Sequence, residues 1–78
     1  MMNGLRSIWT EILNLDTIAD DDNFLDLGGD SIAAMLCLNR IRARFGVDIP
    51  MTVFLAEDMT LRKLASEIDG ATRVERLA

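Results

Sequence analysis

Apolar residues recur at helical spacing in three stretches of the chain. In residues 3–15 they fall at positions i, i+3, i+4 and i+7, namely Leu5, Ile8, Trp9 and Ile12. This spacing places them on one face of an amphipathic helix, and Asn3 stands where its side chain could cap the start of that helix. The last stretch, about residues 61–69, has the same spacing, follows the typical N-cap residue Thr60 and is predicted to end at Gly70.

The stretch between them, Ser31–Phe45, is predicted to form the second helix. Its buried stripe consists of Ala34, Leu38, Ile41 and Phe45, with Cys37 beside it. Gly46 lies where a C-terminal glycine would end this helix, and Pro50 forces an extended connection after it. Residues 51–55 could form a short third helix with Val53 and Phe54 turned inward. No alternating pattern indicates a strand, so the fold class is all-α, a small bundle of three main helices and a short third one.

An acidic segment, residues 16–26, joins the first two helices and has no helical period. Residues 20–22 are all aspartate, but a calcium loop of the EF-hand type needs an oxygen ligand at position 5 and glycine at position 6. Phe24 and Leu25 occupy those positions when the loop is counted from the first aspartate. We therefore expect no metal site, and a solvated loop of repelling charges that Phe24 and Leu27 hold against the core.

The composition indicates one domain over residues 1–78, with a core over about 4–69 and a tail at 70–78. Half of the residues are hydrophobic, which is enough for a core without disulfides or a metal. The single Cys37 lies in the apolar stripe, which indicates a buried, unreactive thiol. Because there is no apolar run of membrane length and no signal-peptide pattern, we expect a cytoplasmic location and no membrane partner.

The charge and the missing residue types exclude several functions. The net charge is −5, and residues 1–30 carry seven acidic residues against one arginine. Such a chain is unsuited to nucleic acid, whose phosphates dominate binding, and the second helix does not reverse this with Arg40, Arg42 and Arg44. The chain has no histidine, which excludes a Ser-His or Cys-His nucleophile pair within it. We therefore expect a protein that is not an enzyme.

The residues around Ser31 are the candidate functional site. Gly28 and Gly29 precede it and leave the backbone free for a positive φ or a close approach to another surface. Asp30 and Ser31 both favour a helix start, where an attached phosphate would meet the positive end of the helix dipole. A second apolar face, rotated away from the buried stripe, consists of Ile32, Met35 and Leu36. That face is either covered by the acidic segment or exposed as a docking surface.

A series of short motifs follows in order along residues 5–69: Phe24, Leu27-Gly28-Gly29-Asp30-Ser31-Ile32, Leu38, Ile41, Phe45-Gly46-Val47, Ile49-Pro50, Phe54, Thr60-Leu61, Leu64-Ala65 and Ile68. This order resembles the phosphopantetheine-carrying acyl and peptidyl carrier proteins. The double glycine and the basic second helix are more similar to the peptidyl carriers of nonribosomal peptide synthesis than to fatty-acid carriers. Many peptidyl carriers have histidine where this chain has Asp30, so Asp30 leaves the subclass open.

The resemblance implies an acyl-carrier-protein-like fold in which Ser31 bears a covalent 4′-phosphopantetheine arm. A phosphopantetheinyl transferase would donate this arm from coenzyme A, and the arm's thiol would hold an amino acid or acyl group as a thioester. Gly29 and Asp30 would hold the attachment motif. Further partners would be an adenylation or acyl-transfer enzyme and downstream condensation or tailoring enzymes. Because the short third helix lies near the arm in relatives, the expected docking residues are Ile32, Met35, Leu36, Met51 and Val53.

We expect a free-standing peptidyl carrier, because the chain begins at Met1 and holds one domain. A monomer is expected, and the sequence leaves a dimer open. An excised synthetase domain is the other interpretation. Two different functions stay open beside it. An acyl carrier of polyketide or fatty-acid synthesis would be distinguished by the enzyme that loads the arm, and an unmodified helical interaction module by the failure of any transferase to modify Ser31.

Overall fold

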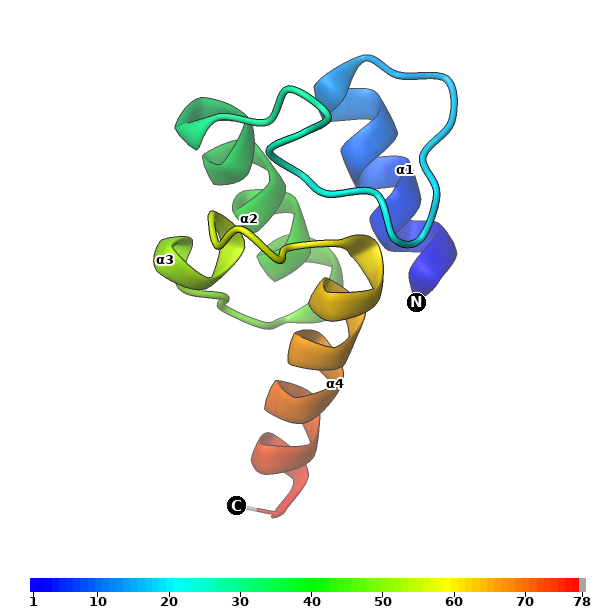
Figure 1. Cartoon of the computed structure of the whole chain (residues 1–78). Helices are drawn as coiled ribbons and strands as arrows, with labels where there is room; N and C mark the ends of the chain where they lie inside the picture. Colours follow the sequence, from blue (N-terminus) through cyan, green and yellow to red (C-terminus); the bar gives the residue numbers. More distant parts are fainter. Residues whose placement is uncertain (78) are drawn as a thin grey trace.

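The computed structural model describes the backbone of residues 1–77 and the side chains of residues 1–71. Within that part the chain forms α1 (Met2–Leu13), α2 (Ser31–Phe45), α3 (Met51–Phe54) and α4 (Leu61–Leu77). Helix α1 packs against α2 and α4, and the short α3 packs against α2 (Figure 1). Strand-type pairing in the described residues is limited to one isolated antiparallel bridge between Asn23 and Thr60. The all-α bundle with a short third helix is confirmed.

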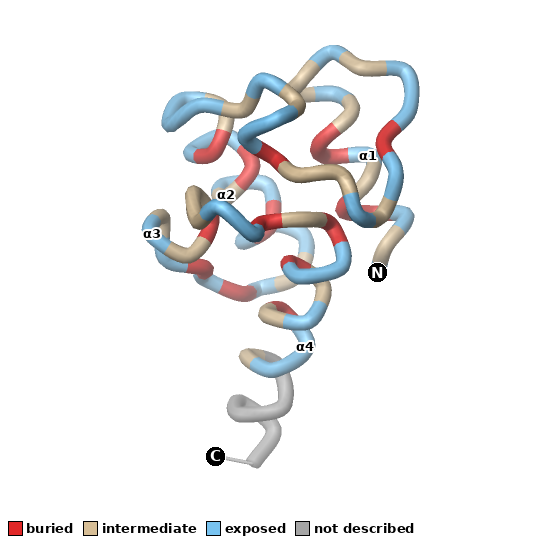
Figure 2. The backbone as a smooth tube through the Cα atoms, viewed as in Figure 1, coloured by how far each residue is buried: buried red, intermediate tan, exposed pale blue. Residues whose placement is uncertain are grey.

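Apolar side chains from all four helices and from the connections form the core (Figure 2). At its centre the rings of Trp9, Phe24 and Phe54 pack edge to face, with centroids 5.0 Å apart for Trp9 and Phe24 and 4.8 Å apart for Phe24 and Phe54. This is a favoured arrangement of aromatic rings, and it joins α1, the α1–α2 connection and α3 at one point. Phe24 thus holds the connection to the core, as predicted.

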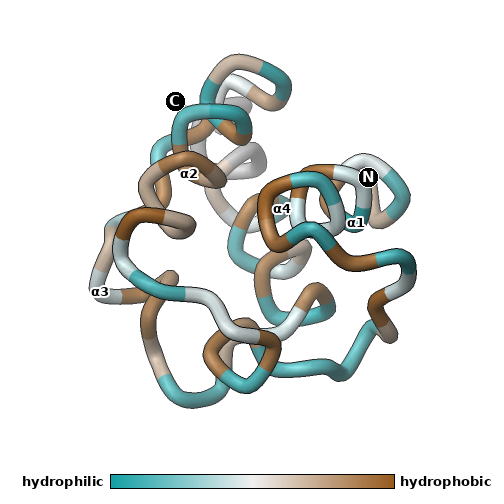
Figure 3. The backbone as a smooth tube through the Cα atoms, turned by 90° about the horizontal axis from the view of Figure 1, so that it is seen from above, coloured by the Kyte–Doolittle hydropathy of each residue, from teal (hydrophilic) through white to brown (hydrophobic). Residues whose placement is uncertain are grey.

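The connections also supply buried residues that helical spacing did not reveal. Apolar positions occur along them as well as along the helices (Figure 3). Besides Phe24, four of them are buried, namely Ile18, Val47, Ile49 and Met59. The core therefore extends beyond the helical stripes.

Helix α1 begins one residue before the predicted start. Asn3 lies inside its first turn, and its Oδ1 atom accepts a hydrogen bond from Arg6 Nη1 at 3.2 Å. The predicted Asn3 cap is therefore wrong. The helix ends at Asn14, whose φ of 56° is left-handed, a conformation that asparagine tolerates better than most residues.

Helix α4 begins as predicted, because Thr60 Oγ1 accepts a hydrogen bond from the Lys63 N–H at 3.1 Å. It does not end at Gly70 but continues to Leu77, so that prediction is wrong. A single glycine weakens a helix by only about 1 kcal/mol relative to alanine. Side chains of the predicted tail beyond residue 71 lie outside the described residues. In the part of the chain that the structure describes, no helix combines the length and apolarity needed to cross a membrane.

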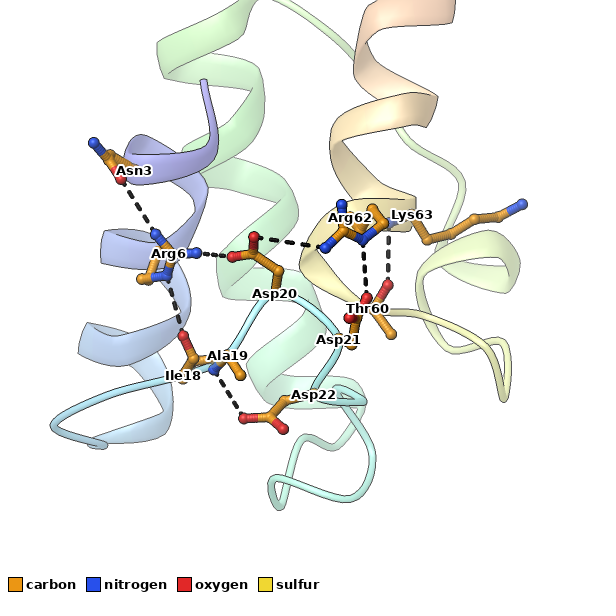
Figure 4. Close-up of polar contacts among 10 residues, drawn as sticks. All are labelled: Asn3, Arg6, Ile18, Ala19, Asp20, Asp21, Asp22, Thr60, Arg62 and Lys63. Atoms are coloured by element: carbon orange, nitrogen blue, oxygen red, sulfur yellow. Dashed lines mark hydrogen bonds and ion pairs between the residues drawn. The ribbon is translucent and has the colours of Figure 1, made fainter.

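The acidic segment is not the loop of repelling charges predicted from the sequence. Asp20 forms ion pairs with Arg6 of α1 and with Arg62 of α4, and Asp21 accepts a hydrogen bond from Arg62 Nε at 2.9 Å (Figure 4). We call Arg6, Asp20, Asp21 and Arg62 the clasp. It ties the segment to two helices. Among the described residues, no cluster of acidic or thiol side chains is arranged to hold a metal ion.

Replacing Arg62 with methionine is expected to destabilise the chain slightly at low salt and hardly at high salt, because exposed ion pairs are screened. The Arg62 guanidinium lowers the pKa of Asp21 by hydrogen bonding and by its charge. The contribution of Asp21 is therefore present above its ordinary carboxyl pKa of 3.8 and is lost as the pH falls through the lowered value. Thermal unfolding at two salt concentrations measures this. Lys63→Met is the charge-matched comparison, because it removes a single ion pair within α4, that with Glu67. An equal salt dependence in both variants would contradict a role for the clasp.

Candidate functional site

Ser31 is the first residue of α2, and its side chain is exposed. Asp30 before it is the N-cap, because its carboxylate accepts a hydrogen bond from the Ala33 N–H at 2.8 Å. Its carbonyl accepts one from the Ala34 N–H, also at 2.8 Å. The Ser31 hydroxyl makes no hydrogen bond to another described residue. The hydroxyl is therefore free to react, and Asp30 rather than Ser31 holds the start of the helix.

The surroundings of this hydroxyl fit a phosphate ester. The first N–H groups of a helix have no intrahelical acceptor, and here they belong to Ser31 and Ile32. These groups and the helix dipole favour a negative charge at this end. The Asp30 carboxylate is the nearest fixed negative charge, but one of its oxygens is engaged with the Ala33 N–H.

The two glycines before Asp30 meet two different backbone requirements. Gly28 has a φ of 95°, and a Cβ atom added there would meet nothing within 4 Å. Gly29 lies so close to Phe24 that an added Cβ would stand 2.3–2.7 Å from three carbons of its ring. Phe24 is fully buried, and its ring packs against Trp9 and Phe54, so any shift of the ring would disturb the core. Gly28 therefore makes the turn, and Gly29 lets the motif pack on the aromatic core.

Replacing Gly29 with alanine is expected to lower the free energy of unfolding by about 1–3 kcal/mol, the usual cost of overpacking a rigid site. The Phe24 ring would have to shift against Trp9, since their centroids lie 5.0 Å apart. Urea unfolding measures the loss. Gly70→Ala is the matched control, because a Cβ there meets nothing and alanine favours a helix. Equal stability of Gly29→Ala and the parent chain would show that the motif can move away from the core.

The second apolar face of α2 is exposed. The acidic segment leaves Ile32 68%, Met35 54% and Leu36 50% accessible, which resolves the two alternatives in favour of an open face. Met51 and Val53 of α3 are half-buried and pack against the core. Apart from the α2 face, the exposed large apolar residues in the described part are Met1 and Leu25. The exposure of Leu25 could not be predicted from the spacing of apolar residues, because Leu25 lies in a segment without helical period.

The arginines of α2 lie in the half of the helix away from Ser31. Arg40 forms an ion pair with Glu11 of α1, and Arg42 forms one with Asp48 beyond the helix end. The Arg44 guanidinium carbon stands 6.0 Å from the centroid of the Phe45 ring. Two of the three arginines of α2 are therefore paired with acidic residues, and the third lies beside an aromatic ring.

Cys37 is buried, and burial raises the pKa of its thiol to about 12, against a smaller lowering by Arg40. The native thiol is expected to resist a chromogenic disulfide reagent at pH 8 and to react with one equivalent after unfolding. Because the folded pKa is raised, the thiol's contribution to stability is present below the unfolded pKa of 9.0 and is lost as the pH rises toward about 12. Rapid labelling of the native, unmodified chain would contradict this burial.

Comparisons with known proteins agree with this geometry. A family model described as "Phosphopantetheine attachment site" matches residues 3–68. The nonribosomal peptide synthetase CymA of Salinispora arenicola is 39% identical over 64 residues, which are 82% of this chain and 1% of that protein. The chain therefore spans a very small part of this curated relative.

Solved carrier proteins have the same fold. A peptidyl carrier protein, solved in complex with the phosphopantetheine transferase Sfp and coenzyme A, is 28% identical with a TM-score of 0.83, and the match covers 88% of each chain. BlmI, a type-II acyl-carrier-protein of Streptomyces verticillus, is 25% identical with a TM-score of 0.80 over 88% of this chain and 82% of its own. The chain therefore belongs to the phosphopantetheine attachment-site family, with peptidyl carrier proteins among its relatives, and this family carries a covalent 4′-phosphopantetheine group.

Proposed function

We propose that this chain is a peptidyl carrier that holds amino acid or acyl groups as thioesters on a 4′-phosphopantetheine arm attached to Ser31. The observation that carries the proposal is the Ser31 hydroxyl itself, which is exposed, unpartnered among the described residues and placed at the start of α2. The arm would supply a thiol on a flexible tether. The chain would supply the attachment oxygen and the surface that partners contact, and no catalytic group.

Attachment would require a phosphopantetheinyl transferase and coenzyme A. The Ser31 oxygen would bond to the phosphorus that bears the pantetheine, the bond from that phosphorus to the adjoining bridging oxygen would break, and adenosine 3′,5′-bisphosphate would leave. The serine proton would be released to a base of the transferase. The related carrier solved with a transferase and coenzyme A supports this partner class.

The cargo is proposed to be an amino acid, and an acyl group is the second candidate. The nonribosomal peptide synthetase among the relatives favours the first, and the acyl-carrier-protein BlmI favours the second. The arm-bearing chain should be offered amino acids with ATP and an adenylation enzyme, and separately an acyl donor with an acyltransferase. Intact mass identifies the thioester. A chain that accepts acyl groups alone would overturn the aminoacyl assignment.

A free-standing carrier is proposed on the likeness to BlmI, a type-II acyl-carrier-protein. An embedded synthetase domain is the second candidate, because the chain covers 1% of CymA. The mass of the protein isolated from its source organism tests this. A mass near that of the 78 residues plus an arm is expected, whereas a much larger polypeptide that contains this sequence would establish an embedded domain. A monomer is proposed as well, and light scattering of the purified chain measures it.

Partner enzymes are proposed to dock on the exposed face of Ile32, Met35 and Leu36, with Met51 and Val53 at its edge. A carrier that visits several enzymes must bind each weakly, through a small surface. Met35→Glu is expected to slow loading by a partner enzyme several-fold at unchanged stability, because a carboxylate would replace an exposed apolar contact. Ser66→Glu on α4 adds the same charge at another exposed position and serves as control. Equal rates for both variants would contradict docking at Met35.

A further inference from the structure

A groove of about 210 Å³ lies between α1 and α2, in the half of α2 away from Ser31. Its lining comes from both helices, with Ser7, Ile8 and Glu11 from α1 and Arg40, Ala43 and Arg44 from α2. The methylene stems of the two arginines add apolar surface beneath their charged heads. The groove therefore combines an apolar surface with positive charge.

Arg44 is the one side-chain cation in the described part of the chain that has no acidic partner. Arg40 pairs with Glu11 across the groove, and the other described side-chain cations have carboxylates of their own. The Arg44 guanidinium instead lies against α1 at Gly4, where an added Cβ atom would stand 3.2 Å from Cζ, and 6.0 Å from the centroid of the Phe45 ring. The lining of the groove thus keeps one uncompensated positive charge.

We propose that this groove binds an acidic segment of the partner protein that docks on α2. A carboxylate of that segment would accept paired hydrogen bonds from the planar Arg44 guanidinium, whose geometry matches it. The exposed Ser7 hydroxyl on the other wall can donate another. The chain carries a net charge of −5, so an acidic segment would be repelled by most of its surface and drawn to this groove.

The groove continues the proposed docking face along α2, and the inference rests on that face for the other end of the partner segment. Ile32, Leu36, Arg40 and Arg44 follow at intervals of four residues, a spacing that places side chains in one row along a helix. The rise of a helix puts Arg40 about 6 Å and Arg44 about 12 Å beyond Leu36. The partner segment is therefore expected to present an apolar side chain and, one or two helical turns further on, carboxylates.

Such a contact would give the docked partner a direction. Apolar contacts at Ile32 and Leu36 alone do not fix which way a partner lies along α2, because they are not directional. A charge contact at the far end of the helix fixes the register and rejects partners that present a cation there. The carrier would thereby select among the enzymes that it visits.

The test titrates the unmodified, isotopically labelled chain with a synthetic helical peptide that carries leucine and, one and two turns further on, glutamate. We expect NMR shifts of the Arg44 Nε–H signal and of the Ile32 and Leu36 amides, which weaken as salt is raised. A peptide with glutamine in place of glutamate should shift Arg44 far less, and so should acetate at the same carboxylate concentration. No shift at Arg44, or equal shifts with the glutamine peptide or with acetate, would overturn the acidic peptide as occupant.

Two variants separate the site from net charge. Arg44→Gln is expected to weaken binding of the glutamate peptide by up to about fivefold, the range of exposed ion pairs, and to leave that of the glutamine peptide unchanged. Arg42→Gln is the matched control, because it removes the same charge from the same helix, but Arg42 pairs with Asp48 and does not line the groove. Both arginines are exposed, so both variants should stay folded. Equal weakening by the two variants would overturn the site.

The failure of this inference and that of the proposed function can be told apart, because the titration needs no arm. Loss of peptide binding with a normal mass gain at Ser31 would overturn the groove and leave the carrier function intact. Peptide binding by a folded chain that no transferase modifies would overturn the carrier function and leave the groove as an interaction site.

Discussion

Replacing Ser31 with alanine is expected to abolish attachment of the arm completely while the chain stays folded. The serine oxygen is the atom that would bond to phosphorus, and alanine has none. The helix start does not depend on it, because the Asp30 carboxylate supplies the cap. The loss of stability should therefore stay within about 0.5 kcal/mol, as for ordinary surface substitutions. Intact mass after incubation with coenzyme A, magnesium and a broad-specificity transferase measures the attachment.

Three variants sharpen this experiment. Ser7→Ala and Ser66→Ala remove exposed hydroxyls elsewhere and should be modified like the parent chain. Asp30→Ala should cost about 1 kcal/mol through the lost cap, which separates the role of the cap from that of the hydroxyl. A mass gain on Ser31→Ala, or its unfolding, would refute the assignment of the site. A parent chain that is folded yet never modified would favour an unmodified helical interaction module.

Replacing Ile41 with alanine is expected to lower the free energy of unfolding by about 2–5 kcal/mol, the range for large apolar residues truncated in a core. Ile41 has 0% exposure and lies in the middle of α2. In a chain of this size such a loss is a large share of the total stability. Urea unfolding followed by far-ultraviolet circular dichroism measures it.

Leu38→Ala is the comparison on the same helix and should cost less than Ile41→Ala. Leu38 is only partly buried against the core, so truncation removes fewer contacts and leaves a smaller cavity. Sequence periodicity alone placed both residues in the same stripe. Equal losses for the two variants would mean that the burial difference between them does not govern stability.

The limits of the helix that bears Ser31 could be predicted from the sequence, but its buried stripe only partly, because Leu38 and Phe45 are only partly buried. The limits of α2 follow from local signals, an acidic cap before it and Gly46 after it, with a left-handed φ of 70°. The end of α4 could not be predicted in this way. Gly70 is a weak local signal, and packing elsewhere along the helix outweighs its small cost.

The clasp could not be predicted because its charges lie far apart in sequence. Arg62 and Asp21 are 41 positions apart, and no helical or strand period relates them. The exposure of the Ile32, Met35 and Leu36 face of α2 could not be predicted for the same reason. Periodicity shows on which side of a helix a side chain lies, but not whether another segment of the chain covers that side. The burial of Met59 was not predicted either, because this residue lies in a connection, where no helical period marks the buried positions. Local patterns thus predicted the position of Ser31, and the tertiary contacts that support it required the structure.

The aromatic cluster gives the molecule an optical probe of its own. The chain has one tryptophan and no tyrosine, so its near-ultraviolet emission originates from Trp9. That indole is buried, and its ring centroid lies 5.0 Å from Phe24 and 6.1 Å from Phe54. Phe24 in turn packs beneath Gly29 at the attachment motif. Emission intensity and wavelength therefore report, without any added dye, whether the segment that presents Ser31 is seated on the core or lifted from it.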